Sequence, residues 1–152
     1  MLNLEKNFLK KRILIYGLGK SGLSTYSFLK KNNVISLFDD RIIAKKKTKD
    51  THTTYKEIIK EEFDCIIISP GIDINKCKLS RFLKKNHKKI YTDLDIFYSR
   101  YAFNQKITIT GTNGKSTTAK LLYDILKDQK KDVRLVGNIG NPVLLEKKIK
   151  KD

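Results

Sequence analysis

The sequence has no tryptophan and only two cysteines in 152 residues. Cys65 and Cys77 do not have the spacing of metal ligands, and Cys65 lies in an apolar run. No apolar run approaches the roughly 20 residues that a membrane-spanning helix needs. The first residues, Met1 to Lys6, lack the apolar stretch and cleavage site of a signal peptide. These absences predict a soluble protein of the reducing cytoplasm with no membrane partner.

Arginine is also scarce, although the chain is strongly basic. It holds 33 basic and 16 acidic residues, a net charge of +17, but only five of the basic residues are arginine. The excess of positive charge is +11 in residues 1–105 and +6 in residues 106–152. It is therefore spread along the chain roughly in proportion to length and forms no basic tail. Proteins that recognise bases rely on arginine, whose planar fork pairs with guanine. We therefore expect lysine-rich solvated surfaces and no nucleic-acid partner.

Apolar runs alternate with segments of helical periodicity over residues 12–101. The runs predict strands at 12–16, 34–38, 64–68 and 89–91. Apolar spacings of three and four residues predict helices at 21–31, at 55–60, around 79–83 and from Asp93 to Tyr101. The polar stretch 44–54 predicts a loop. This alternation predicts an α/β fold, a Rossmann-like parallel sheet with helices on both faces.

The alternation begins again after residues 103–105. We expect strands at 106–110 and 132–136, a helix through Ala119 to Leu126, a turn at 137–140 and a last helix near Pro142. The pattern thus predicts two domains, residues 1–104 and residues 105–152. Two strands and two helices are too few for the second domain to cover its own sheet. We therefore expect it to be incomplete, the truncated start of a larger α/β domain.

The first glycine motif, Gly17-Leu18-Gly19-Lys20-Ser21-Gly22, lies between a predicted strand and a predicted helix. In this setting glycine allows a tight turn and lets a pyrophosphate approach the backbone amides at the helix N-terminus. Asp39, at the end of the second strand, can accept a hydrogen bond from a ribose or a base. The motif predicts a binding site for a nucleotide that carries a diphosphate. It does not distinguish a nicotinamide dinucleotide from another diphosphate nucleotide.

The second glycine motif is Gly111-Thr112-Asn113-Gly114-Lys115-Ser116-Thr117, after the run 107–109. Its amides can surround phosphate, Lys115 can reach the β/γ oxygens, and the Ser116 hydroxyl can ligate Mg²⁺. The longer pattern G-x-x-x-x-G-K-S/T would need glycine at position 109, where this chain has isoleucine. The motif therefore predicts a shorter phosphate-binding loop (P-loop), and residues 105–152 become the start of a P-loop α/β ATPase domain.

These motifs together resemble those of the Mur ligase family. The segment TGTNGKST (110–117) resembles the ATP-binding loop of Mur ligases and of their folylpolyglutamate relatives. Four further motifs occur in the family's order: GLGKSGLS (17–24), SPGI (69–72), DLDIF (93–97) and GNIG (137–140). The resemblance spans about Lys11 to Leu145. It is closest to the members that add D-glutamate to UDP-N-acetylmuramoyl-L-alanine in peptidoglycan synthesis. The L-alanine-adding sibling is the nearest alternative.

The resemblance implies which residues bind each ligand. The UDP-sugar would be bound by Gly17, Gly19, Lys20, Ser21, Gly22, Asp39, Asp40, Arg41, Gly71 and Asn138. ATP would be bound by Gly111, Thr112, Asn113, Gly114, Lys115, Ser116 and Thr117, with Ser116 on Mg²⁺. In the implied reaction ATP phosphorylates the substrate carboxylate and the amine of D-glutamate displaces phosphate. Lys115 would be catalytic, because its charge and Mg²⁺ would neutralise the transferring phosphoryl group.

The chain departs from the family in length. Family members have three domains, including later central-domain residues (a metal-binding glutamate, a histidine and a modified lysine) and a C-terminal domain that binds D-glutamate. His52 and His87 match nothing catalytic and are expected at the surface. We expect this chain alone to be a monomer without activity. Two alternatives stay open: a UDP-sugar or dinucleotide-binding module without chemistry, and an NAD-dependent oxidoreductase, which the first motif favours and the second opposes.

Overall fold

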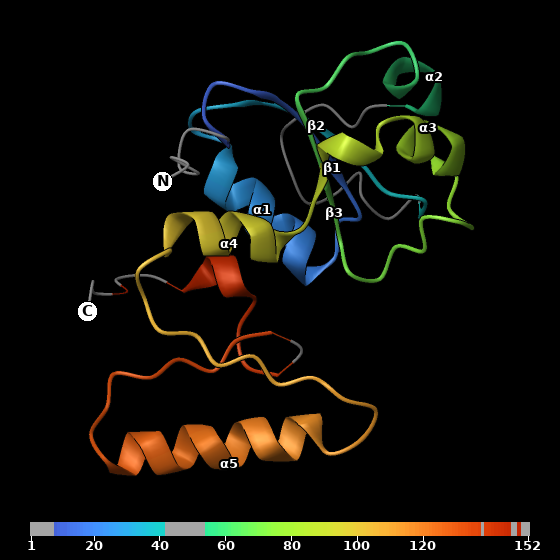
Figure 1. The fold of residues 1–152 in the computed structure, drawn as a ribbon. Helices are drawn as coiled ribbons and strands as arrows, with labels where there is room; N and C mark the ends of the chain where they lie inside the picture. The colour runs from blue at the N-terminus through green and yellow to red at the C-terminus, as the bar shows by residue number, and fades with distance from the viewer. Residues whose placement is uncertain (1–7, 42–53, 138, 147–148, 150–152) are drawn as a thin grey trace.

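The protein is described by a computed structural model that covers residues 8–41, 54–137, 139–146 and 149. Most of the predicted loop at 44–54, and with it His52, lies outside these residues. The elements of the first part, in chain order, are β1 (Arg12–Tyr16), α1 (Lys20–Leu29), β2 (Val34–Phe38), α2 (Tyr55–Ile58), β3 (Cys65–Ile68), α3 (Ser80–Lys85), η3 (His87–Lys89), β4 (Ile90–Tyr91) and α4 (Asp93–Arg100). α5 (Lys115–Asp128) and the short 3₁₀ helix η4 (Val143–Leu145) follow (Figure 1).

The four strands form one parallel sheet in the order β2-β1-β3-β4. All four strands predicted in this part of the chain are confirmed, with β3 and β4 each one residue shorter at the start. The predicted helices are confirmed too, although α1 begins at Lys20 and ends at Leu29, and α2 ends at Ile58. The parallel α/β fold of this region therefore matches the prediction.

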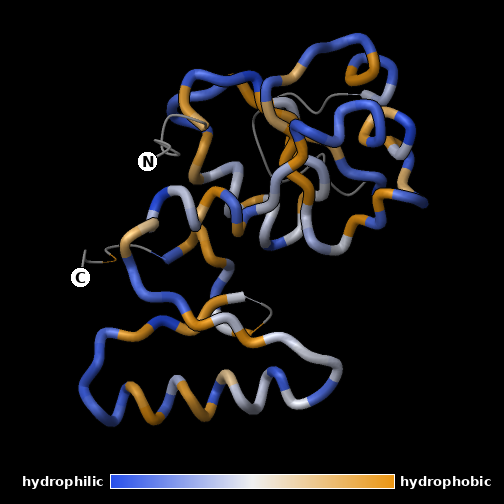
Figure 2. The backbone as a smooth tube through the Cα atoms, in the orientation of Figure 1, coloured by the Kyte–Doolittle hydropathy of each residue, from blue (hydrophilic) through white to orange (hydrophobic). Residues whose placement is uncertain are grey.

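Each face of the sheet is covered by its own set of helices, because alternate strand residues point to opposite faces. On one face Ile13 and Ile15 belong to a core that α1 and α4 cover. On the other, Leu14 and Tyr16 pack in a second core with Ile58 of α2 and Leu83 of α3. Figure 2 shows this concentration of apolar residues along the strands. Both faces of the sheet are thus covered by helices, and the carboxyl ends of the strands stay outside the two cores.

The two strands predicted after residue 105 are absent from the described structure. Residues 106–110 form no strand, and of residues 132–136 only Val136 makes an isolated bridge, to Asn141. Ile107 is 67% exposed. A parallel strand needs a hydrogen-bonded neighbour on at least one side, and these segments do not pair with each other. The prediction of strands at 106–110 and 132–136 was therefore wrong for this structure.

The last predicted helix is also replaced, by the short 3₁₀ helix η4. Val143 and Leu144 of η4 are 3% and 5% exposed and belong to the same core as Ile13 and Ile15 of β1. η4 contacts both α1 and α4. The chain therefore returns to the first sheet after residue 142, and two of its late residues complete the core of the first region.

Helix α5 lies apart from the sheet. It was expected from the spacing of Ala119 to Leu126 and is confirmed as a helix of 14 residues, yet it contains no buried residue. Leu121 and Ile125 are 60% and 46% exposed. Figure 1 shows α5 beyond the extended segments that precede and follow it, on neither face of the sheet. No helix within the described residues is both long and apolar enough to cross a membrane.

Candidate functional site

The first glycine loop connects β1 to α1, and close contacts explain its glycines. Gly17 has a φ of +91°, and its amide donates to the carbonyl oxygen of Phe38 at 2.8 Å. A Cβ atom at Gly22 would lie 1.8 Å from the carbonyl oxygen of Gly17. The Ser69 hydroxyl, after β3, donates to that same oxygen at 2.7 Å. The loop is therefore held against the carboxyl ends of β2 and β3.

The position of this loop is the one where parallel α/β sheets bind ligands. The chain passes from β1 to β2 on one side and to β3 on the other, so the strand order reverses between β1 and β3. Ligands bind in the crevice outside the carboxyl ends of the strands at such a point. Gly19 is exposed there, and a Cβ atom on it would have no neighbour within 4 Å. The backbone at Gly19 is thus open to a phosphate group.

Asp39 shapes the loop through both of its carboxylate oxygens. Oδ2 accepts a hydrogen bond from the amide of Leu18 at 2.6 Å, and Oδ1 accepts one from the amide of Arg41 at 2.9 Å. Asp39 therefore links the glycine loop after β1 to the turn after β2. This role differs from the direct contact with a ribose or base that the sequence suggested.

Asp40 is held by two long side chains. The Tyr16 hydroxyl donates to Oδ1 of Asp40 at 2.7 Å, and the Lys78 ammonium donates to the Asp40 carbonyl oxygen at 3.0 Å. Burial, followed by hydrogen bonds with Asp40 and Cys77, raises the pKa of the Tyr16 phenol far above its usual value. The Tyr16 phenol, like any phenol at neutral pH, is protonated and can donate this hydrogen bond.

The structure brings nine of the ten predicted UDP-sugar residues to one edge of the sheet. Lys20, Arg41 and Gly71 are exposed, and Ser21 is half-buried with its carbonyl oxygen bound by the hydroxyls of Ser24 and Thr25. The remaining five are Gly17, Gly19, Gly22, Asp39 and Asp40, in the contacts given above. Asn138 lies outside the described residues. His87 is exposed, as expected.

The second glycine loop opens α5 and is exposed almost throughout. Gly111 and Gly114 have φ values of +146° and +74°, which favour glycine, and Gly114 is the N-cap of α5. The Lys115 ammonium donates to the carbonyl oxygens of Gly111 and Thr112. The cation therefore lies over its own loop, next to the amides at the start of α5, an arrangement that suits a phosphate group.

Ser116 is the only predicted metal ligand, and its hydroxyl is exposed. Within the described part of the chain, no three His, Cys, Asp or Glu side chains lie close enough to hold a metal ion. A single hydroxyl fits Mg²⁺ held chiefly by nucleotide phosphates and water, which is the usual manner for this ion. Among the described residues, no hydrogen bond or ion pair joins the second loop to the first.

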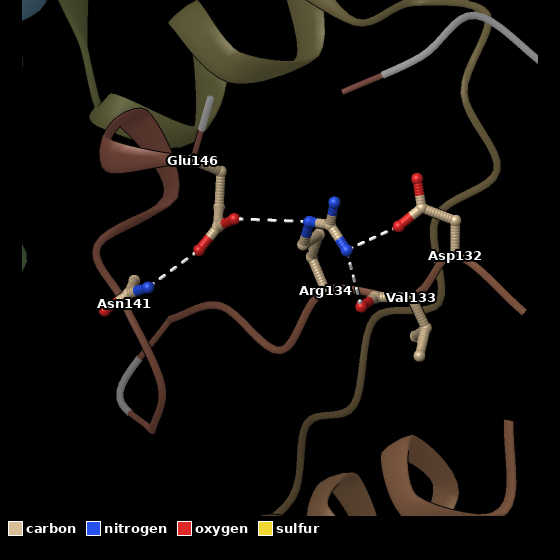
Figure 3. Close-up of polar contacts among 5 residues, drawn as sticks. All are labelled: Asp132, Val133, Arg134, Asn141 and Glu146. Atoms are coloured by element: carbon tan, nitrogen blue, oxygen red, sulfur yellow. Dashed lines mark hydrogen bonds and ion pairs between the residues drawn. The ribbon is translucent and has the colours of Figure 1, made fainter. Parts of the chain in front are cut away.

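Polar and charged side chains connect the segments on the two sides of residue 138 (Figure 3). Arg134 makes ion pairs with Asp132 and, at 3.5 Å, with Glu146. Glu146 also accepts a hydrogen bond from the Asn141 side chain at 2.8 Å. These contacts connect the segment before the turn to η4, which is anchored in the first core.

Three residues of this edge were not among the predicted site residues: Ser69, Tyr16 and Lys78. Ser69 belongs to the SPGI motif, so the sequence pointed to its position. Its hydrogen bond to the Gly17 carbonyl oxygen could be found only in the structure. Tyr16 ends an apolar run, and a buried phenol at a strand end needs a polar partner, which is a usable signal. Nothing in the sequence pattern distinguishes Lys78 from its many lysine neighbours.

Two parts of the chain match known protein families. Residues 11–90 match the N-terminal domain of the MurD-like Mur ligases, and residues 109–152 match the Mur ligase middle domain. The first match covers more than half of the chain. The chain therefore belongs to the Mur ligase family.

Three similar curated proteins share one name. UDP-N-acetylmuramoylalanine–D-glutamate ligase of Rickettsia bellii (strain RML369-C) is 34% identical over 143 residues, which cover 91% of this chain and 32% of the relative. The enzyme of the same name from Wolbachia sp. subsp. Brugia malayi (strain TRS) is 38% identical over 149 residues, covering 89% and 29%. That from Caldicellulosiruptor bescii is 33% identical over 150 residues, covering 88% and 32%. The chain thus spans about a third of the length of these relatives.

Proposed function

We propose that this chain supplies the nucleotide-sugar site and the ATP-binding loop of a cytoplasmic ligase that adds D-glutamate to UDP-N-acetylmuramoyl-L-alanine. The observation that carries the proposal is the edge where Gly17, Gly19, Asp39, Asp40 and Gly71 meet, in a chain that also has a Gly-Lys-Ser loop. The names of the curated relatives support the same activity. Residues 1–104 would be the UDP-sugar domain and residues 105–152 the beginning of the ATP domain.

The residues of each loop would have distinct roles. The exposed backbone at Gly19 and the N-terminus of α1 would bind the diphosphate, with Lys20 and Ser21 beside it. Asn138 would reach the substrate from the ATP domain. Lys115 and the amides of 111–117 would bind the ATP phosphates.

The chemistry would follow from charge neutralisation. ATP with Mg²⁺ would transfer its γ-phosphoryl group to the substrate carboxylate, which would give an acyl phosphate and release ADP. Lys115 would exchange its carbonyl partners for phosphate oxygens and so stabilise the negative charge, with Ser116 near the metal ion. The D-glutamate amine would then displace phosphate. We expect the 152-residue chain, as a monomer, to bind ligands without forming this product.

Calorimetric titration tests the proposal with two ligands on one protein. We expect UDP to bind, and NAD not to compete with it. We expect ATP with Mg²⁺ to bind the unchanged chain and not the Lys115→Ala variant, which should keep its UDP affinity. Binding of NAD without any response to UDP would contradict the proposal and favour an oxidoreductase. Release of phosphate that depends on D-glutamate would show that this chain is active by itself.

A further inference from the structure

Tyr16 carries a hydroxyl at a position that the core alone would fill with an apolar side chain. It ends β1 and is 0% exposed, and its ring packs against Phe38 at 5.2 Å between centroids. A buried phenol needs a hydrogen-bond partner. The partner is Oδ1 of Asp40, at 2.7 Å, in the turn that faces the carboxyl edge of the sheet.

The two neighbouring carboxylates differ in what they can still bind. Each oxygen of Asp39 already accepts a backbone amide, from Leu18 or from Arg41. Asp40 uses only Oδ1, and no described residue donates a hydrogen bond to its Oδ2. Its backbone is held as well, by the Lys78 ammonium on its carbonyl oxygen. Asp40 is therefore fixed at two points, and within the described part of the chain its Oδ2 accepts no hydrogen bond.

We propose that Tyr16 is a positioning residue, which holds Asp40 so that Oδ2 accepts a hydrogen bond from the nucleoside of the bound UDP-sugar. The donor would be the imide N–H of uracil or a ribose hydroxyl. This inference rests on the proposed function. A carboxylate held in one orientation before binding loses less conformational entropy when the ligand arrives, so the phenol contributes to affinity without touching the nucleotide.

Tyr16→Phe tests the inference because it removes the hydroxyl and keeps the ring against Phe38. A hydrogen bond to a charged group contributes enough that we expect the Kd for UDP to rise about five- to thirtyfold. The matched control is Tyr98→Phe, whose hydroxyl contacts Thr108 Oγ1 at 3.0 Å on the exposed surface of α4. The control should bind UDP as the unchanged chain does, and thermal melting verifies that both variants are folded.

A double-mutant cycle separates positioning from packing. Asp40→Ala should weaken UDP binding, and Tyr16→Phe added to Asp40→Ala should weaken it no further. Losses that simply add would mean that Tyr16 acts through the core, and the inference would be overturned. CDP and 2′-deoxy-UDP identify the donor. If the donor is the imide, Asp40→Ala should reduce the preference for UDP over CDP. If the donor is the ribose hydroxyl, Asp40→Ala should reduce the preference for UDP over 2′-deoxy-UDP. No change in either preference would also overturn it.

The UDP titration distinguishes a failure of the positioning role of Tyr16 from a failure of the proposed function. If the unchanged chain binds UDP and Tyr16→Phe binds it equally well, the positioning role fails and the proposed function stands. If the unchanged chain does not bind UDP, the proposed function fails, and the role of Asp40 fails with it.

Discussion

The two glycine loops lie in opposite surroundings. The first is packed between two strands, and its glycine carbonyl, its amides and both oxygens of Asp39 are bound within the protein. The second lies on the exposed end of α5, where Lys115 bonds to its own loop. Both use glycine with positive φ ahead of a helix. A glycine-rich loop ahead of a helix can therefore take its local shape from a few backbone angles, whether or not a core supports it.

The largest expected effect is on the first loop. Gly22→Ala would place a Cβ atom 1.8 Å from the Gly17 carbonyl oxygen, so that the loop or α1 must move. We expect the free energy of unfolding to fall by about 3 kcal/mol or more. Gly19→Ala is the control, because a Cβ atom there meets nothing within 4 Å, and it should cost about 1 kcal/mol or less. Urea unfolding followed by circular dichroism measures both, and equal losses would contradict the packed loop.

A second variant tests how far the two regions are independent. Leu144 is 5% exposed in the first core, and Leu145 beside it is 45% exposed. Leu144→Ala should therefore reduce the free energy of unfolding by about 2 to 4 kcal/mol, and Leu145→Ala by about 0.5 kcal/mol. Hydrogen exchange should show faster amides in β1 for Leu144→Ala alone. Unchanged exchange in β1 would mean that η4 does not support the sheet.

The same chemical change at two lysines compares the regions directly. The Lys115 ammonium bonds to exposed carbonyl groups, whereas that of Lys89 donates to the carbonyl oxygen of Phe63, beside the second core, at 2.9 Å. Lys115→Ala should change the unfolding free energy by less than about 0.5 kcal/mol, and Lys89→Ala should lower it by about 1 kcal/mol. Thermal melting at matched ionic strength gives both values. A larger loss for Lys115→Ala would mean that the second loop is coupled to the sheet.

The smallest expected effect is on pH dependence at α2. The amide and hydroxyl of Thr54 bond to Glu57 and lower the pKa of its carboxyl group. Because the folded pKa is depressed, the stabilisation is present above the ordinary glutamate pKa of about 4.5 and is lost as the pH falls through the folded value. Amides of α2 should thus lose protection in acid before those of β1. Glu57→Gln should remove this dependence; its persistence would point to another group.

The sequence predicted the regions where local pattern and packing agree. Short apolar runs placed all four strands, and the glycine motif with Asp39 identified the edge of the sheet that carries the candidate site. The absence of strands at 106–110 and 132–136 could not be predicted in this way, because pairing depends on a neighbouring strand and not on the residues of one segment. The contacts of Tyr16 with Asp40 and of Leu144 with the first core join positions that are far apart in the chain. Hydrophobic periodicity describes only neighbouring residues, so it could not predict these contacts.

The burial of Val143 and Leu144 has a consequence for the order of events during synthesis. A ribosome makes β1, β2, β3 and β4 long before it makes η4, yet the core beneath α1 and α4 includes those two late residues. Contacts between distant parts of a chain form slowly, and N-terminal units usually fold first during translation. The nascent sheet would therefore emerge with one face partly uncovered, and it would be open to chaperones or to aggregation until residue 144 leaves the ribosome.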